Sequence, residues 1–177
     1  VSGFQNGLGT ASQFKAPQSL AIDPIDGKYA LLTESCCSGT ATQNVNVIRK
    51  IKLDTYEVTT VAGSATTAGN VDGGQSARFI SLRGIAIDPI EGKYALVVQY
   101  NYPYASVRRI DLSNFSVTTL AGGGTTSTDG PGVDGTGSEA VFHQCVGITI
   151  DPTGTFALVN SRHNAGYQIR KIVIASG

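Results

Sequence analysis

A phrase built around "IDP" occurs three times in this chain of 177 residues, and this repeat constrains the fold more than any other feature. Its aspartates lie 65 residues (23 to 88) and 63 residues (88 to 151) apart, and they are Asp23, Asp88 and Asp151. The phenylalanines upstream keep the same spacings and are Phe14, Phe79 and Phe142. The repeat predicts one domain, residues 1–177, made of three similar units at about 4–63, 64–122 and 123–177.

Each unit is expected to form four short strands. In the first unit these are "LAID", "YALLT", "VIRKIKL" and "VTTVAG", and the second unit closes with the matching "VTTLAG". The β-branched and aromatic content of these segments is typical of strands. The "DPIDGK" between the first two is a turn, because Pro fixes φ and Gly supplies a positive φ. No helical periodicity is sustained, so the prediction is an all-β fold with three four-stranded blades.

Recurring four-stranded antiparallel units are typical of β-propellers. The combination of "GIAIDP", "YALV", "IRKI" and "VTTLAG" resembles the NHL-repeat β-propeller family over essentially the whole chain. The resemblance implies an NHL-type β-propeller or a partial propeller. The chain departs from the family where Leu82 and Cys145 stand at the position of Pro17. It also departs after the second strand, where "TESCC", "VQYNY" and "NSRHN" replace the usual family motif.

The boundaries of the repeat do not coincide with the boundaries of the predicted four-stranded blades. The opening "VSG" matches the end of a fourth strand, and the final "QIRKIVIASG" ends in or just after a third strand. Closed propellers use roughly 4 to 8 blades, and open sheet edges attract other strands. We therefore expect further blades of the same chain, or a second copy, to complete the ring. The frame and the absence of Met favour a fragment of a longer chain.

Charge and composition disfavour two classes of partner. Thirteen basic residues balance thirteen acidic ones, so the chain has no general attraction for nucleic acid. No apolar run approaches the roughly 20 residues that span a bilayer. An RNA-binding NHL module remains an alternative hypothesis, for which the only local concentration of basic side chains is Arg78, Arg83, Arg108 and Arg109.

The polar residues that recur in every unit are predicted to be structural, because a catalytic or ligand-specific residue usually stands in one blade only. The arginines of the third strand are expected to bond a carboxylate or carbonyl group in each blade, and they are Arg49, Arg108 and Arg170. The aspartates of the repeat, Asp23, Asp88 and Asp151, are expected to cap the turn that follows them.

No catalytic or cofactor site is predicted. The two histidines, His143 and His163, fall short of the three ligands that a catalytic metal normally needs. Asp72, Asp129 and Asp134 lie in Gly-rich loops and leave Ca²⁺ open as a ligand, although their spacing fits no EF-hand. The enzyme hypothesis is a six-bladed lactonase or amidating lyase whose site lies mainly in other blades.

Cysteines and a sequon suggest a secreted or cell-surface protein. Cys36, Cys37 and Cys145 could form a disulfide, either between the vicinal pair and Cys145 or with another chain. Asn114 begins an N-glycosylation sequon in a turn. Tyr100, Tyr102 and Tyr104 alternate and are candidates for partner contact or for packing on the next blade. The predicted function is a non-enzymatic extracellular interaction or structural module that binds other proteins or glycans within a larger assembly.

Overall fold

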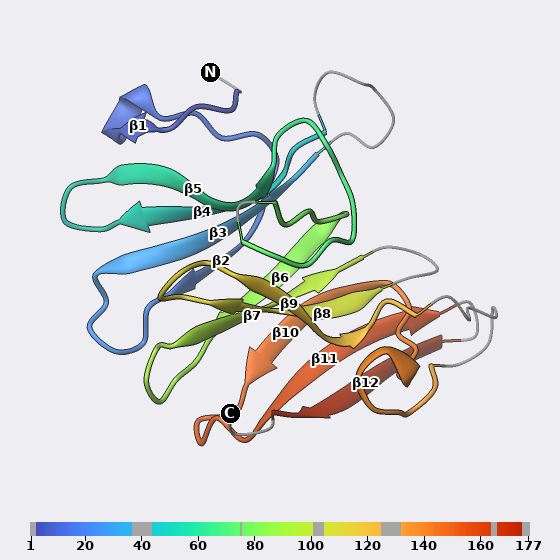
Figure 1. Ribbon diagram of the computed structural model, residues 1–177. Coiled ribbons are helices and arrows are strands. Elements are labelled where there is room, and N and C mark those ends of the chain that lie inside the picture. Colours follow the sequence, from blue (N-terminus) through green and yellow to red (C-terminus); the bar gives the residue numbers. More distant parts are fainter. Residues whose placement is uncertain are drawn as a thin grey trace.

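The computed structural model describes residues 3–36, 44–74, 76–100, 105–124, 132–163 and 166–174. They form three antiparallel sheets that follow one another along the chain as the blades of a partial β-propeller (Figure 1). We number these blades one to three. The only helices among the described residues are two 3-10 turns, and neither is long or apolar enough to cross a membrane: η1 (Gly9–Ala11) and η2 (Gly137–Glu139).

The sheets follow the repeat. Blade one has the order β1-β5-β4-β3-β2 and contains β1 (Gly7–Leu8), β2 (Pro17–Ile22), β3 (Tyr29–Ser35), β4 (Asn46–Lys52) and β5 (Glu57–Ser64). Blade two has the order β6-β7-β8-β9 and contains β6 (Leu82–Ile87), β7 (Tyr94–Gln99), β8 (Ser106–Asp111) and β9 (Val117–Gly122). Blade three has the order β10-β11-β12 and contains β10 (Cys145–Ile150), β11 (Phe156–His163) and β12 (Gly166–Val173).

The strand number departs from four in two blades. Blade one gains a short fifth strand, because Gly7 and Leu8 pair with Val58 and Glu57 on the outer edge of β5. Blade three holds three strands in the part of the chain that the structure describes, and β12 lies at one edge of this described sheet.

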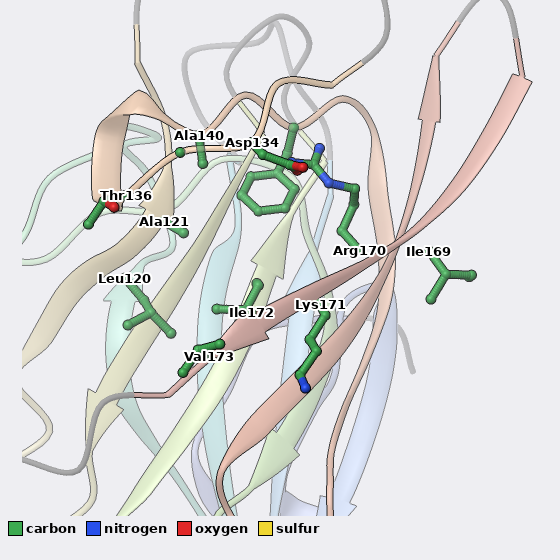
Figure 2. A pocket seen from close by; sticks show the side chains of 13 residues that line it. Leu120, Ala121, Asp134, Thr136, Ala140, Ile169, Arg170, Lys171, Ile172 and Val173 are labelled. Atoms are coloured by element: carbon green, nitrogen blue, oxygen red, sulfur yellow. The ribbon is translucent and has the colours of Figure 1, made fainter.

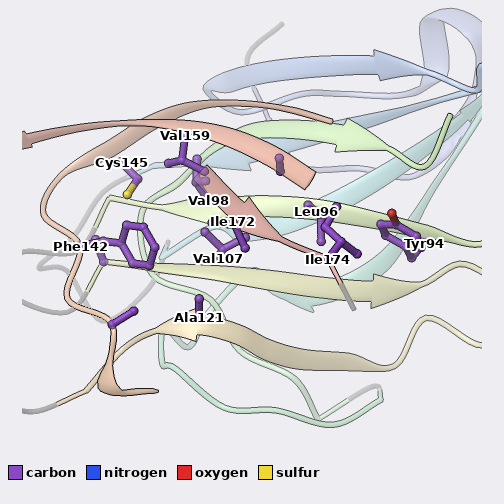
Figure 3. Packing of buried hydrophobic residues seen from close by; sticks show 13 residues of the cluster. Tyr94, Leu96, Val98, Val107, Ala121, Phe142, Cys145, Val159, Ile172 and Ile174 are labelled. Atoms are coloured by element: carbon purple, nitrogen blue, oxygen red, sulfur yellow. The ribbon is translucent and has the colours of Figure 1, made fainter. Parts of the chain in front are cut away.

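The hydrophobic core lies between the blades rather than within them. The first strands of the blades contact one another, with β6 between β2 and β10. Blade two turns five apolar residues toward blade one: Ile85, Ile87, Ala95, Val97 and Ile110. Blade three turns the five equivalent residues toward blade two: Ile148, Ile150, Ala157, Val159 and Ile172. Figure 3 shows this second interface, in which Leu96, Val98 and Val107 meet Val159 and Ile172. One pattern thus builds both interfaces.

The repeated aspartates cap the turns between the first and second strands. Asp23 Oδ1 accepts the backbone N–H of Ile25 at 3.2 Å, and Asp88 Oδ1 accepts that of Ile90 at 3.0 Å. Asp151 accepts more bonds, from the backbone N–H groups of Thr153 at 3.0 Å and Phe156 at 2.8 Å among others. This is the turn-capping role that the sequence pattern indicated for these three residues.

Both copies of "VTT-AG" end on a glycine because no other residue fits there. Gly63 and Gly122 have φ angles of 94° and 81°, in the left-handed region. A Cβ atom on Gly122 would also lie 2.5 Å from the carbonyl oxygen of Ala105 and 2.7 Å from the ring of Phe142. The recurring phrase is therefore fixed by backbone conformation and by the next blade's phenylalanine.

The Asp151 turn predicts an acid-dependent loss of stability. Partial burial would raise the pKa of Asp151, but the Thr153 hydroxyl and three backbone N–H groups outweigh it and lower that pKa to about 2. Because the folded-state pKa lies below the unfolded value of about 3.9, the stabilisation is complete above pH ~4 and is lost as the pH falls toward 2. We expect Asp151→Asn to be less stable than the wild type at pH 7.

The measurement is the thermal midpoint of both proteins between pH 7 and pH 2. The difference in thermal midpoint between the wild type and Asp151→Asn should shrink below pH 4. Protonation of Asp151 then removes the carboxylate charge from the wild type, and the variant lacks that charge at every pH. A difference that stays constant down to pH 2 would show that the carboxylate does not stabilise the turn through its charge.

Candidate interaction surface

An arginine of the third strand ties each blade to the loop that precedes its first strand. Arg108 on β8 donates to the carbonyl oxygens of Val71 at 3.0 Å and Arg78 at 3.3 Å. The two other arginines bond the equivalent pairs of carbonyls: Arg49 those of Gln5 and Gln13, and Arg170 those of Val133 and Val141. We call this arrangement the arginine clip. The guanidinium also lies over the repeated phenylalanine of its blade, at 5.4 Å for Phe14, 5.4 Å for Phe79 and 5.0 Å for Phe142.

The carboxylate that neutralises the clip comes from different places. In blades two and three it is the next residue of the clipped loop, because Arg108 pairs with Asp72 at 2.5 Å and Arg170 with Asp134 at 2.6 Å. In blade one that position is Asn6, and Glu34 on β3 supplies the charge instead, 2.8 Å from Arg49. The three arginines are therefore structural ligands within their own blades and do not form a basic stripe.

The clip also explains the acidic residues of the Gly-rich loops. Asp72 holds Arg108 and in addition accepts the backbone N–H of Thr119 at 3.1 Å. Partial burial would raise the pKa of Asp72, but these hydrogen bonds and the guanidinium hold it below its usual value. Asp72 and Asp134 serve different blades, and Asp129 lies outside the described residues. Across the described ranges, no three His, Cys, Asp or Glu side chains gather as a metal-binding group.

The cysteines do not form the bridge that the sequence left open. Cys36 is disulfide-bonded, whereas Cys145 is a free thiol, so the two are not partners. Cys145 begins β10 inside the core between blades two and three, where its thiol donates to the carbonyl oxygen of His143 at 3.3 Å. Burial raises the pKa of this thiol to about 12. Cys37 lies outside the described residues.

The other candidate residues lie apart from one another. The ring of Tyr100 follows β7 and packs 5.1 Å from the guanidinium of Arg83, while Tyr102 and Tyr104 fall outside the described residues. Asn114 is exposed in the turn between β8 and β9, where its side-chain oxygen accepts the backbone N–H of Ser116 at 2.8 Å. The rings of His143 and His163 lie 6.0 Å apart.

The basic residues considered for RNA contact are engaged within the blades. Arg108 is fully buried in its clip. Arg109 lies 4.2 Å over the ring of Tyr94, and Arg78 donates to the carbonyl oxygen of Ala77 at 2.8 Å. Arg83, besides stacking on Tyr100, donates to the side chain of Gln18.

Blades one and three expose apolar side chains at positions where blade two buries them. Leu20 and Ile22 on β2 are 60% and 62% exposed, whereas their equivalents on β6, Ile85 and Ile87, are 5% and 7% exposed. At the other end Ile169 on β12 is 69% exposed, and its equivalent on β8 is the fully buried Val107. We call Leu20 with Ile22 the first end face, and Ile169 with the partly exposed Leu158 the last end face. These residues were not singled out from the sequence, although the alignment of the repeats contains the signal.

A groove of about 660 Å³ runs beside β12 (Figure 2). One wall is β12 itself from Ile169 to Val173, and the other is the clipped loop of blade three around Asp134 and Gly135. Leu120 and Ala121 of β9, with Ala140 and Phe142, add an apolar surface. Figure 2 shows the side chain of Arg170 reaching across toward Asp134.

Comparison with known proteins identifies the architecture and not the family. No family model matches the chain, and no curated protein sequence matches it. A chain in the nidogen/laminin complex superposes with a TM-score of 0.57 at 16% identity, over 89% of this chain and 44% of that one. An auxiliary nutrient binding protein of Bacteroides thetaiotaomicron gives 0.63 at 20% identity, over 90% and 38%. A protein of unknown function from the same species gives 0.60 at 20% identity, over 89% and 47%. The chain thus spans less than half of each solved chain.

Burial of the clip predicts a large difference between two matched substitutions. Glu34 and Arg49 are both fully buried, so Glu34→Gln leaves a buried guanidinium without its counter-charge. We expect this change to lower the free energy of unfolding by about 3–5 kcal/mol. Asp134→Asn removes the same kind of partner in blade three, but the Asp134 side chain is 97% exposed, so the expected loss is below about 1 kcal/mol.

Urea unfolding followed by circular dichroism measures both losses on the same scale. Similar losses in the two variants would contradict the role assigned to burial in the clip of blade one.

Proposed function

We propose that this chain is a non-enzymatic interaction module of a secreted or cell-surface protein, built from NHL-type propeller blades, that binds other proteins or glycans. The observation that carries the proposal is the pair of end faces. Each repeats the apolar positions that join one blade to the next, yet each faces solvent. A surface of that kind is complementary to another β-sheet face.

The energetics favour a covered state for these faces. Burying one exposed Leu or Ile side chain contributes about 1.5–3 kcal/mol. Leu20 and Ile22 on the first end face, and Ile169 on the last end face, therefore offer apolar anchors for a partner at each end, with the polar rim of the sheets supplying specificity. Further blades of the same polypeptide, a second copy or a different protein with a β-sheet face are all partners of this chemistry.

The polar residues and the structural neighbours support the same proposal. The recurring Arg and Asp side chains hold each blade together through hydrogen bonds. We therefore assign their charges a structural role rather than a catalytic one. One neighbour belongs to a nidogen/laminin complex, and another is an auxiliary nutrient binding protein. Both descriptions concern binding, and the first concerns association between proteins.

The test introduces charge on the end faces. Leu20→Lys with Ile22→Lys, and separately Ile169→Lys, should weaken capture of partner proteins or glycans about tenfold or more, because a lysine cannot be buried without its hydration. Capture is measured by immobilising each variant, applying extracellular and surface proteins of the source, and quantifying what is retained, with a glycan panel in parallel. Thr118→Lys adds the same charge at an exposed position of the middle blade and serves as control.

Equal retention by the end-face variants, the control and the wild type would contradict the proposal. Stoichiometric Zn²⁺ or Ca²⁺ in the purified protein, together with lactone hydrolysis, would support the enzyme hypothesis in its place.

An extracellular setting also predicts modification of Asn114, whose exposed turn leaves room for a glycan. Secretion of the chain from a eukaryotic host should increase its mass above 18.4 kDa, and a glycosidase should remove the increase. Asn114→Gln should show no such increase. An unmodified wild-type chain after secretion would argue against this site.

A further inference from the structure

Each blade stacks a second cation on an aromatic ring, beside the turn between its first and second strands. The ring begins the second strand. The cation directly follows the clip arginine, so its side chain leaves the third strand on the opposite face. The three pairs have similar distances from the cation to the ring centroid: Lys50 over Tyr29 at 4.1 Å, Arg109 over Tyr94 at 4.2 Å and Lys171 over Phe156 at 4.2 Å.

The turn of blade three closes a pocket over the pair in blade two. Tyr94 and Arg109 form one wall, and the turn of residues 153–155 forms the other, around a space of about 470 Å³. The turn is held close to blade two, because a Cβ atom on Gly154 would lie 3.1 Å from the side chain of Ile90. We call this space the Arg109 pocket.

An equivalent pocket lies between blades one and two. Tyr29 and Lys50 face Gly92 there, around a space of about 450 Å³. A Cβ atom on Gly92 would lie 3.0 Å from the side chain of Ile25, so the same turn contact positions this wall. Both volumes fall within the range of small-molecule sites, roughly 300–1,000 Å³. The pocket is therefore built into the way one blade packs on the next.

One wall of the Arg109 pocket offers hydrogen-bond donors. Within the described part of the chain, the guanidinium of Arg109 makes no hydrogen bond or ion pair beyond its stacking on Tyr94. Burial, and then the carboxylate of Asp88, raise the pKa of Tyr94 above its usual value, and Arg109 opposes this only in part. The phenol therefore keeps its proton. Figure 3 shows Tyr94 at the end of the apolar cluster.

The opposite wall offers acceptors and apolar surface. Both threonine hydroxyls direct protons toward the carboxylate of Asp151, Thr155 at 3.3 Å and Thr153 at closer range. Their oxygens therefore keep lone pairs for a ligand. The pocket is also lined by the side chains of Ile90 and Ile174.

The charges that line the Arg109 pocket balance. Two carboxylates, Asp88 and Glu91, stand against two cations, Lys93 and Arg109. Glu91 pairs with Lys93 at 2.7 Å. The two oxygens of Asp88 accept the backbone N–H groups of Ile90 at 3.0 Å and Lys93 at 3.1 Å. The pocket thus favours a ligand that is uncharged and rich in groups that both donate and accept.

We propose that the Arg109 pocket binds a neutral sugar residue, a hexose in its ring form, of a glycan. Arg109 and Tyr94 donate to sugar hydroxyls on one wall, and Thr153 and Thr155 accept from hydroxyls on the other. The two isoleucines contact the C–H groups of the sugar ring. The inference rests on the proposed function, for which it names a class of glycan, but its site lies between two blades and not on the end faces.

The experiment titrates the ¹⁵N-labelled 177-residue chain with glucose, galactose, mannose and N-acetylglucosamine at millimolar concentrations. The amide resonances of residues 153–155 are followed by NMR, and we expect saturable shifts with at least one sugar. Arg109→Gln should weaken binding about tenfold, since it removes a charged hydrogen-bond donor. Thr155→Val keeps the shape of the side chain and should weaken binding about fivefold, because it removes an acceptor.

The matched control is Lys171→Gln, which removes the stacked cation of blade three, outside the Arg109 pocket. It should leave the sugar affinity unchanged, and thermal midpoints show that each variant is folded. Absence of saturable shifts with all four sugars, or equal affinity of the wild type, Arg109→Gln and Thr155→Val, would overturn the proposal. Binding of glucuronic acid alone would also overturn it, because the pocket would then recognise a carboxylate.

The end-face variants report separately on the proposed function. Loss of partner capture by Leu20→Lys with Ile22→Lys, without sugar binding by the wild type, would reject the sugar site and keep the interaction module. Sugar binding that depends on Arg109, with intact capture by every end-face variant, would keep the sugar site and reject the role of the end faces.

Discussion

The arginine clip is the interaction on which the rest of the molecule depends. A guanidinium buried in a blade loses its hydration, and that loss is offset when its terminal N–H groups are bonded and its charge is neutralised. Among the described residues, the Nε–H groups of Arg49 and Arg108 have no hydrogen-bond partner. Each clip provides two backbone carbonyls and a carboxylate, on top of a phenylalanine ring. The loop between blades is thereby attached to the strands that follow it, and the phenylalanine is held in the interface where the core forms.

In all three blades a carboxylate neutralises the clip arginine, but the carboxylate does not come from the same sequence position in each blade. Where Asn6 replaces the aspartate of the loop, Glu34 provides the charge from the neighbouring strand, and burial of the pair becomes complete. The remaining polar groups adapt around the same frame: the backbone N–H of Lys15 bonds Glu34, that of Ile80 bonds Gln99, and that of His143 bonds Ser161. One position of the second strand thus accepts three different side chains because each offers an oxygen to the same backbone donor.

The strands and turns were predictable from the sequence, because strand alternation and turn residues are local patterns. The structural role of Arg49, Arg108 and Arg170 was predictable because these arginines recur in every unit of the repeat. The ion pairs were not predictable, because a carboxylate can reach the guanidinium from the loop or from β3. The sequence therefore did not assign Asp72 and Asp134 to the arginines, and it left them open as possible Ca²⁺ ligands. The sequence leaves Cys145 open as a disulfide partner because it does not reveal that this residue faces the core between blades two and three. The end faces and the groove beside β12 depend on how the blades sit next to one another, which a single repeat unit does not encode.

The equivalence of the blade interfaces has a consequence for the history of such chains. One face of each blade is complementary to the opposite face of the next blade. The residues of both faces belong to one repeat unit of about 60 residues. Tandem duplication of that unit supplies a new blade together with both of its contacts, so no fresh interface has to arise. Ring size in such an architecture is free to change by copying or deleting whole units, while selection on the interface itself stays the same.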